Sequence, residues 1–238
     1  MKLTKLFILT SVILGSLFFL FGLEVWPEPS TNILMEGQEL LDLVAESDVI
    51  IIFNSGGWGN TPLEKAEDFA PIIEGIEKSL KDFGYSSLVI PYTRTKDDFF
   101  GKITGVRDFL SSFKSSSEVL AEKVEFLTKN FPDKKIIVAG LSAGGAFVNE
   151  TMKNISEETQ DSVYGIAAGT PFWHEKVESE NILYLDNNGR DILAVGDIKS
   201  LVFSLFSRTD QITIGHWYSW DSPEVGSQIV TFLKNKFR

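Results

Sequence analysis

The 238-residue sequence predicts an α/β fold, a three-layer α/β/α sandwich whose mostly parallel sheet of about six strands lies between helices. Two observations support this prediction. Short apolar runs such as residues 49–53 show no alternation with polar residues, which is typical of strands covered on both faces. These runs alternate along the chain with segments whose apolar residues recur at helical spacing, as helical crossovers between parallel strands require.

The N-terminal segment differs from the rest of the chain. Lys2 and Lys5 precede residues 6–23, which carry no charge and can just span the hydrocarbon core of a bilayer. Positive charge before such a span places the N-terminus in the cytoplasm and the following domain across the membrane. A cleaved signal peptide is the alternative, and it would make the protein secreted. No small-x-small cleavage site follows, so a single-pass anchor preceding an extracytoplasmic domain is favoured for residues 1–26.

Residues 27–48 are expected to form a linker and a short helix, and residues 49–238 the globular domain. Three glycines follow the first strand within the stretch 56–59, where the backbone can turn sharply and present N–H groups to a ligand. The stretch 61–83 is predicted to form one helix, opened by a capping box and kinked at Pro71.

The rest of the chain continues the alternation of strands and helices. A second capping box is predicted at 115–118, and residues 93–117 are predicted to form a loop with short helical pieces, either a small lid or ordinary core. Further strands are predicted at residues 88–90, 136–138, 162–168, 181–185 and 211–214, and further helices at 36–47, 115–130, after residue 142, within 192–207 and from 222 onward.

The candidate nucleophile lies between the strand at 136–138 and the helix after it. The turn reads Gly140-Leu141-Ser142-Ala143-Gly144, the G-x-S-x-G spacing. A serine on a sharp strand-to-helix turn has a strained backbone, and bulky residues two positions to either side would collide. The turn holds the hydroxyl near the positive end of the helix, where an oxyanion can be stabilised. Ser142 is therefore predicted to be a nucleophile.

A serine nucleophile needs a base and a third group that orients the base. The sequence has two histidines. His216 follows the last predicted strand and precedes the last helix, whereas His174 lies beyond the strand after the serine helix, so position favours His216. Asp191 ends the turn after the penultimate strand and is the preferred acid. Asp186, at the end of the same strand, remains the alternative.

The order of Ser142, an acid and His216 on alternating strands and helices resembles the α/β-hydrolase superfamily over residues 49–236. The resemblance implies a reduced, esterase- or lipase-like version of this fold. The stretch 169–180 is short, so the large cap domain of many members is expected to be absent.

The resemblance also implies where an oxyanion would be bound. The two donors would be the backbone N–H of Ala143 and that of Gly57 or Trp58. In this superfamily a His-Gly pair commonly follows the strand before the oxyanion loop, whereas this chain has Asn54-Ser55-Gly56-Gly57 there.

Composition narrows the function further. The absence of cysteine excludes disulfides, thiolate metal sites and a cysteine nucleophile, and the net charge of −11 makes nucleic acid an unlikely partner. The prediction is a serine hydrolase that cleaves a carboxylic ester or thioester through an acyl-serine and needs no metal or organic cofactor. Its substrate would be a small-molecule acyl ester, which a membrane could supply as a lipid. Its second partner would be the membrane itself, bound through residues 6–23. The alternatives are an acyltransferase or peptidase with the same nucleophile, and a non-catalytic, membrane-tethered binding module.

Overall fold

The computed structural model describes residues 38–95, 108, 111–197 and 215–238. Within these ranges the strands are β1 (Val49–Asn54), β2 (Ser87–Tyr92), β3 (Lys135–Leu141), β4 (Val163–Ala168) and β5 (Ile182–Leu185). The α-helices are α2 (Gln38–Glu46), α3 (Ala70–Asp82), α5 (Lys114–Asn130), α6 (Ala143–Asn154), α7 (Ile192–Val195) and α10 (Pro223–Phe237), and two short 3-10 helices are η1 (Leu63–Lys65) and η2 (Gln160–Ser162).

The strands form one sheet of five strands in the order β2-β1-β3-β4-β5, and each neighbouring pair is parallel. Ile51 in β1, for example, pairs with Val89 in β2 and with Ile137 in β3. The predicted α/β fold with a parallel sheet is thus confirmed. The strand predicted at 211–214 lies outside the described residues, so a sixth strand stays a prediction.

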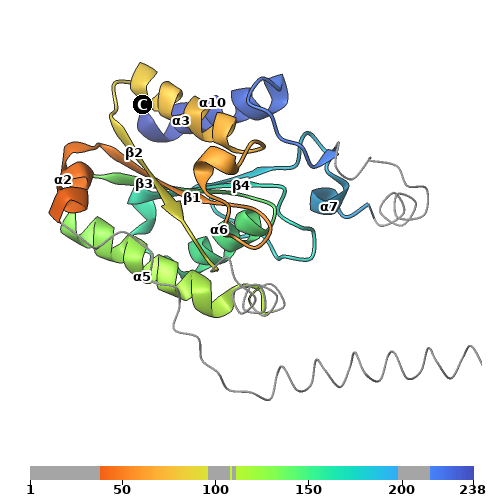
Figure 1. Ribbon diagram of the computed structural model, residues 1–238, viewed down its shortest axis with the longest axis horizontal. Helices are drawn as coiled ribbons and strands as arrows, with labels where there is room; N and C mark the ends of the chain where they lie inside the picture. The colour runs from red at the N-terminus through yellow and green to blue at the C-terminus, as the bar shows by residue number, and fades with distance from the viewer. Residues whose placement is uncertain (1–37, 96–107, 109–110, 198–214) are drawn as a thin grey trace, which may run out of the picture.

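Helices cover both faces of the sheet, which gives the three predicted layers. In Figure 1, α3 and α10 cover one face, and α5 and α6 cover the other. Successive residues of β1 enter the two cores in turn: Ile51 packs toward α3 and α10, and Ile50 and Ile52 pack toward α5 and α6. All three side chains are at most 1% exposed, and burying each contributes about 1.5–3 kcal/mol. The sheet is therefore a firm platform for the loops at its carboxyl edge.

The stretch 61–83 does not form the single helix that was predicted. It contains η1, a break, and then α3, with Pro71 in the first turn of α3. A proline there is favoured because the first helical N–H groups have no intrahelical acceptor, so Pro71 begins a helix and does not kink one.

Both predicted capping boxes are wrong. Pro62 precedes η1, and no side chain caps the backbone there. The helix α5 begins at Lys114, one residue before the expected cap, after Phe113 with a φ of 60° and no side-chain cap.

None of the described helices is long and apolar enough to cross a membrane. Residues 6–23 lie outside the described residues, so the N-terminal membrane helix stays a prediction. Most of the predicted loop at 93–117 also lies outside the described residues, so its role as a lid stays a prediction.

Candidate active site

Ser142 occupies the turn between β3 and α6. Its φ of 58° and ψ of −117° lie in a region that residues other than glycine rarely adopt. The neighbouring chain holds this conformation, because the N–H of Ser142 donates a hydrogen bond of 2.8 Å to the carbonyl oxygen of Ala168 at the end of β4. The serine is partly exposed at the carboxyl edge of the sheet. A strained residue that the surrounding structure maintains is characteristic of functional sites.

The two glycines of the G-x-S-x-G pattern are required by close packing. A Cβ on Gly140 would lie 2.5 Å from the carbonyl oxygen of Gly144. A Cβ on Gly144 would lie 2.3 Å from the carbonyl oxygen of Asn54, the last residue of β1. Both distances are far shorter than van der Waals contact. The pattern therefore allows the first turn of α6 to press against the end of β1, which brings Ser142 beside the loop that follows β1.

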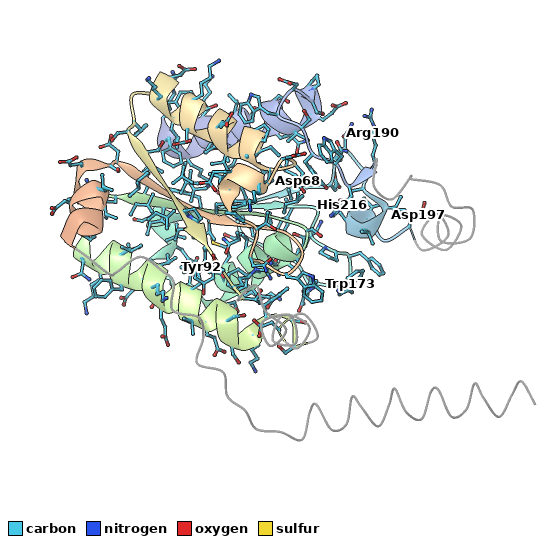
Figure 2. The ribbon with its side chains drawn as sticks, in the orientation of Figure 1. Asp68, Tyr92, Trp173, Arg190, Asp197 and His216 are labelled. Atoms are coloured by element: carbon cyan, nitrogen blue, oxygen red, sulfur yellow. The ribbon has the colours of Figure 1, made fainter. Side chains whose placement is uncertain are left out.

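His216 and Asp191 form a hydrogen-bonded pair near this turn. The distance from His216 Nδ1 to Asp191 Oδ2 is 2.7 Å, and the Asp191 side chain is 1% exposed. An ionised carboxylate only accepts hydrogen bonds, so Nδ1 of His216 donates to it, and in the neutral tautomer that keeps this bond Nε2 is an acceptor. Figure 2 shows His216 toward the end of the molecule where α7 lies, and α2 lies at the opposite end (Figure 1).

Asp191 receives hydrogen bonds from four donors. Its Oδ1 accepts from the N–H groups of Leu193 at 3.0 Å and Ala194 at 3.2 Å, in the first turn of α7. Its Oδ2 accepts from His216 and from the Tyr218 hydroxyl at 2.7 Å. Burial by itself raises the pKa of Asp191, but the hydrogen bonds from His216, Tyr218 and Ala194 outweigh it and hold the pKa below its usual value. The carboxylate is therefore ionised at neutral pH.

Tyr218 is a member of this site that the sequence did not indicate. Its side chain is 1% exposed, and its hydroxyl also lies 3.1 Å from the carbonyl oxygen of Leu185. Burial and the neighbouring Asp191 carboxylate raise its pKa, so the hydroxyl stays protonated and donates. No motif marks Tyr218, and its position two residues after His216 is the only signal in the sequence.

The two alternative residues take other roles. Asp186 accepts a hydrogen bond from the N–H of Gly189 at 3.0 Å and so shapes the turn after β5. His174 is 4% exposed and its ring stacks on Phe113 with 6.2 Å between centroids. Burial lowers the pKa of His174 and favours a neutral ring. The structure thus pairs Asp191, and not Asp186, with His216.

Gly169 connects the Asp191–His216 pair to the serine turn. A Cβ on Gly169 would lie 2.7 Å from His216 Cε1 and 3.0 Å from Asp191 Oδ2, so the imidazole rests on this glycine. Gly169 directly follows Ala168, which binds the N–H of Ser142. Within the described part of the chain, His216 Nε2 has no hydrogen-bond partner, and the Ser142 hydroxyl is not bonded to it. Such bonds are often long in unliganded enzymes and shorten when substrate binds.

Residues 55–59, called here the glycine loop, lie against the serine turn. A Cβ on Gly56 would lie 3.2 Å from the carbonyl oxygen of Leu141 and 3.7 Å from Ser142 Cβ. Gly56 is thus in contact with the turn, as is Ser55, whose carbonyl oxygen would lie 2.7 Å from a Cβ on Gly144, whereas the sequence pointed to Gly57 and Trp58.

The predicted oxyanion donors all have N–H groups that no described residue accepts. Ala143 is the first residue of α6, and Gly57, with a φ of 53°, and Trp58 lie in the glycine loop. Across the described ranges, none of these three N–H groups donates a hydrogen bond. They therefore remain candidates for binding a developing oxyanion.

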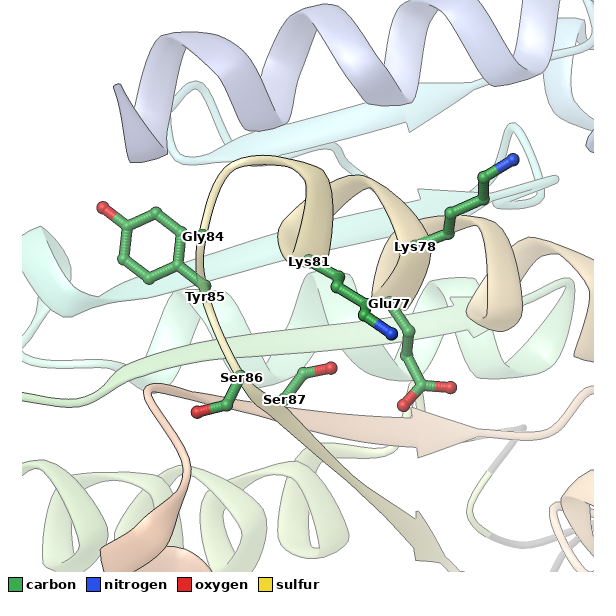
Figure 3. A pocket seen from close by; sticks show the side chains of 7 residues that line it. All are labelled: Glu77, Lys78, Lys81, Gly84, Tyr85, Ser86 and Ser87. Carbon is green, nitrogen blue, oxygen red and sulfur yellow. The ribbon is translucent and has the colours of Figure 1, made fainter.

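A surface hollow of about 740 Å³ lies elsewhere on the molecule. Ser86 and Ser87, where β2 begins, line part of it together with Lys78 and Lys81 of α3 (Figure 3). Because the five described strands are parallel, this hollow lies at the amino edge of the sheet, opposite the edge that carries Ser142. It is not part of the candidate site.

The parallel sheet with its serine turn, and a buried acid–histidine pair beyond its last described strand, define an α/β-hydrolase-like fold. No protein-family model matches the sequence, and no curated protein matches it significantly. Among solved structures, an acetylxylan esterase is 15% identical with a TM-score of 0.51, over 81% of this chain and 100% of that chain. A Trichoderma reesei cutinase, in complex with a C11Y4 phosphonate inhibitor, is 18% identical with a TM-score of 0.47, over 77% of each chain. The likeness to the acetylxylan esterase shows the fold.

Proposed function

We propose that this protein is a serine hydrolase that cleaves a carboxylic ester or thioester through an acyl-serine intermediate. The observation that supports this most directly is the 2.7 Å hydrogen bond between buried Asp191 and His216, beside a serine with a φ of 58°. Burying a carboxylate and fixing a serine in a strained conformation both cost stability, so an arrangement that combines them argues for chemistry at this site. For the same reason the non-catalytic binding module is less favoured.

The reaction follows from the positions of these groups. Ser142 Oγ attacks the acyl carbon while His216 Nε2 takes the hydroxyl proton, and Asp191 holds the imidazole in the required tautomer. N–H groups of Ala143 and the glycine loop would stabilise the oxyanion, each donor being worth about 3–4 kcal/mol. The imidazolium then gives its proton to the leaving alcohol or thiol. Water, deprotonated by His216, attacks the acyl-serine, the carboxylic acid leaves, and the proton returns to Ser142.

Exposed apolar side chains at the carboxyl edge of the sheet support a substrate ester with an apolar part. Seven large hydrophobic side chains are exposed among the described residues, and two of them, Leu43 and Phe126, are on the helices α2 and α5. The other five lie on segments that follow strands β1, β4 and β5 or the candidate base, and four are aromatic. They are Trp58, Phe172, Trp173, Val195 and Trp217.

The cellular site we propose is a membrane surface. Residues 6–23 would anchor the chain, with the hydrolase domain on the extracytoplasmic side. Cleavage of this segment would instead release a secreted enzyme.

The proposed activity is tested with p-nitrophenyl esters of several acyl lengths. Wild type and Ser142→Ala are compared as full-length chains, with Ser227→Ala on the far helix α10 as the matched control. We expect the control to match wild type and Ser142→Ala to lose turnover. Turnover that survives in Ser142→Ala would contradict the role of Ser142. Addition of alcohols or amines then separates hydrolysis from acyl transfer by the products formed.

A further inference from the structure

We propose that Arg94 is a positioning residue of this site, which holds the glycine loop by its carbonyl groups and so directs the loop N–H groups toward Ser142. This inference rests on the proposed function, and it goes beyond that function in assigning a role to a buried cation that takes no part in the chemical steps.

Residues 94 and 95, just after β2, bind four carbonyl oxygens of the glycine loop. Arg94 Nη2 donates to the oxygens of Ser55 at 2.8 Å and Gly57 at 3.3 Å. The backbone N–H of Arg94 donates to Gly59 at 2.8 Å, and Thr95 Oγ1 donates to Trp58 at 2.6 Å. The fifth carbonyl, that of Gly56, accepts from the N–H of Gly59 at 3.0 Å. Every carbonyl group of the loop is therefore fixed in direction.

Fixed carbonyl groups also fix the N–H groups that follow them. The described chain has no cis peptide bond, and in a trans peptide the C=O and the next N–H point in opposite directions. The N–H of Gly56 is thus opposite the Ser55 carbonyl that Arg94 binds, and the N–H of Trp58 is opposite the Gly57 carbonyl. The hydrogen bonds from Arg94 and Thr95 to the loop carbonyl groups are called here the clamp. Since Gly56 contacts the serine turn, the clamp determines which face of the loop lies toward Ser142.

The position of the Arg94 side chain links the loop to the serine helix. Its guanidinium lies 5.0 Å from the ring centroid of Phe113 and 5.3 Å from that of Phe147 in α6. The residue is 6% exposed, and burial lowers its pKa to about 10, so it remains charged at neutral pH. Asp108 attracts this charge. Cation–π contacts and the carbonyl dipoles together offset part of the cost of burying the guanidinium.

Gly59 is the position in the loop that admits this side chain. A Cβ on Gly59 would lie 2.4 Å from Arg94 Nε and 2.7 Å from Nη2. The last glycine of the loop is therefore explained by the arginine, which reaches the carbonyl groups only because no side chain stands in its way.

The test measures kcat and KM of full-length variants with a p-nitrophenyl ester. Arg94→Met removes the donors while keeping an apolar stem, and Thr95→Val removes one carbonyl contact without touching the buried charge. Arg238→Met is the matched control, because Arg238 also lies over an aromatic ring, that of Phe83, but binds no loop carbonyl. We expect kcat to fall about 100-fold in Arg94→Met and about 10-fold in Thr95→Val, with KM changed less than about 3-fold, since a misdirected oxyanion donor affects the transition state.

A further variant, Arg94→Ala, tests the role of the guanidinium directly. Added methylguanidinium should restore at least part of its kcat, which a merely structural role would not predict. The proposal is overturned if folded Arg94→Met and Thr95→Val keep the wild-type kcat, or if only KM changes. If Arg94→Met does not fold, Thr95→Val decides. A wild type that turns over no ester would instead contradict the proposed function and not the clamp.

Discussion

At the scale of single residues, Asp191 is the most constrained group of the site. Its buried carboxylate is held by four donors from two segments, the first turn of α7 and residues 216–218, and its pKa lies below the usual value near 3.8 because those hydrogen bonds outweigh the effect of burial. A carboxyl group whose folded-state pKa is depressed stabilises the fold above its unfolded pKa, and this stabilisation is lost as pH falls through the folded pKa.

We therefore expect wild-type stability to decrease as pH falls below about 4, and Asp191→Asn to lack this part of the pH dependence. Urea unfolding of both chains between pH 7 and pH 3 measures the difference. The same variant should lose about 10³-fold or more in kcat, because an amide no longer holds the required tautomer of His216. Equal pH dependence in the two chains would contradict the ionised state of Asp191.

Tyr218 gives a second prediction at this scale. Tyr218→Phe removes a hydrogen bond to a buried carboxylate, an interaction worth about 1.5–3 kcal/mol. We expect stability to fall by this order and kcat to fall about 10-fold, because Asp191 is held less firmly. Tyr85→Phe is the control, since the Tyr85 hydroxyl binds the carbonyl oxygen of Phe237 far from Ser142. The role of Tyr218 is refuted if both variants lose stability and neither loses kcat.

At the scale of elements, the turn between β3 and α6 depends on the small residues that flank Ser142. An alanine at Gly144 would bring Cβ to 2.3 Å from the Asn54 carbonyl oxygen, so α6 must move away from β1. We expect Gly144→Ala to lose more than about 2 kcal/mol of stability and nearly all activity.

Gly84→Ala is the matched control for that prediction. Gly84 has a φ of 92° but open space at its Cβ, so alanine there costs backbone strain of about 1–2 kcal/mol and leaves the site intact. Comparison of urea midpoints with ester turnover separates the two effects. A Gly144→Ala enzyme that is as active as Gly84→Ala would show that the close approach is not required.

Elements were predictable where the pattern is local. The apolar run at 49–53 and the run at 181–185 correspond to β1 and β5 within one residue, because a buried parallel strand has no competing periodicity. The division of the stretch 61–83 into two helices was not predictable, because helical spacing alone does not show that a new helix begins near Pro71.

Part of the candidate site was predictable because strands can be located from local apolar runs. Ser142, Asp191 and His216 each follow a predicted strand, and the carboxyl ends of parallel strands share one edge. The contacts of Tyr218, Gly56 and Arg94 come from segments far apart in the sequence or from a loop conformation. No periodicity or motif records such contacts.

At the scale of the whole molecule, the proposed hydrolase is expected at a membrane surface. Residues 6–23 are predicted to span a membrane, and a charge at the middle of such a span costs about 2.5–3.5 kcal/mol. We expect the full chain to stay with membranes during carbonate extraction and Ile13→Arg to be released, whereas Ile13→Leu should behave as wild type. Recovery of the uncleaved wild-type chain in the soluble fraction would contradict the anchor.

The role proposed for Ser142 is that of a nucleophile activated by His216 and Asp191. It is tested most directly by incubating the full-length chain with a fluorophosphonate and mapping the adduct by mass spectrometry. We expect one phosphonyl group per chain, bound to Ser142, and labelling that is strongly slowed in His216→Ala. A folded wild type that remains unlabelled, or is labelled at another serine, would contradict it.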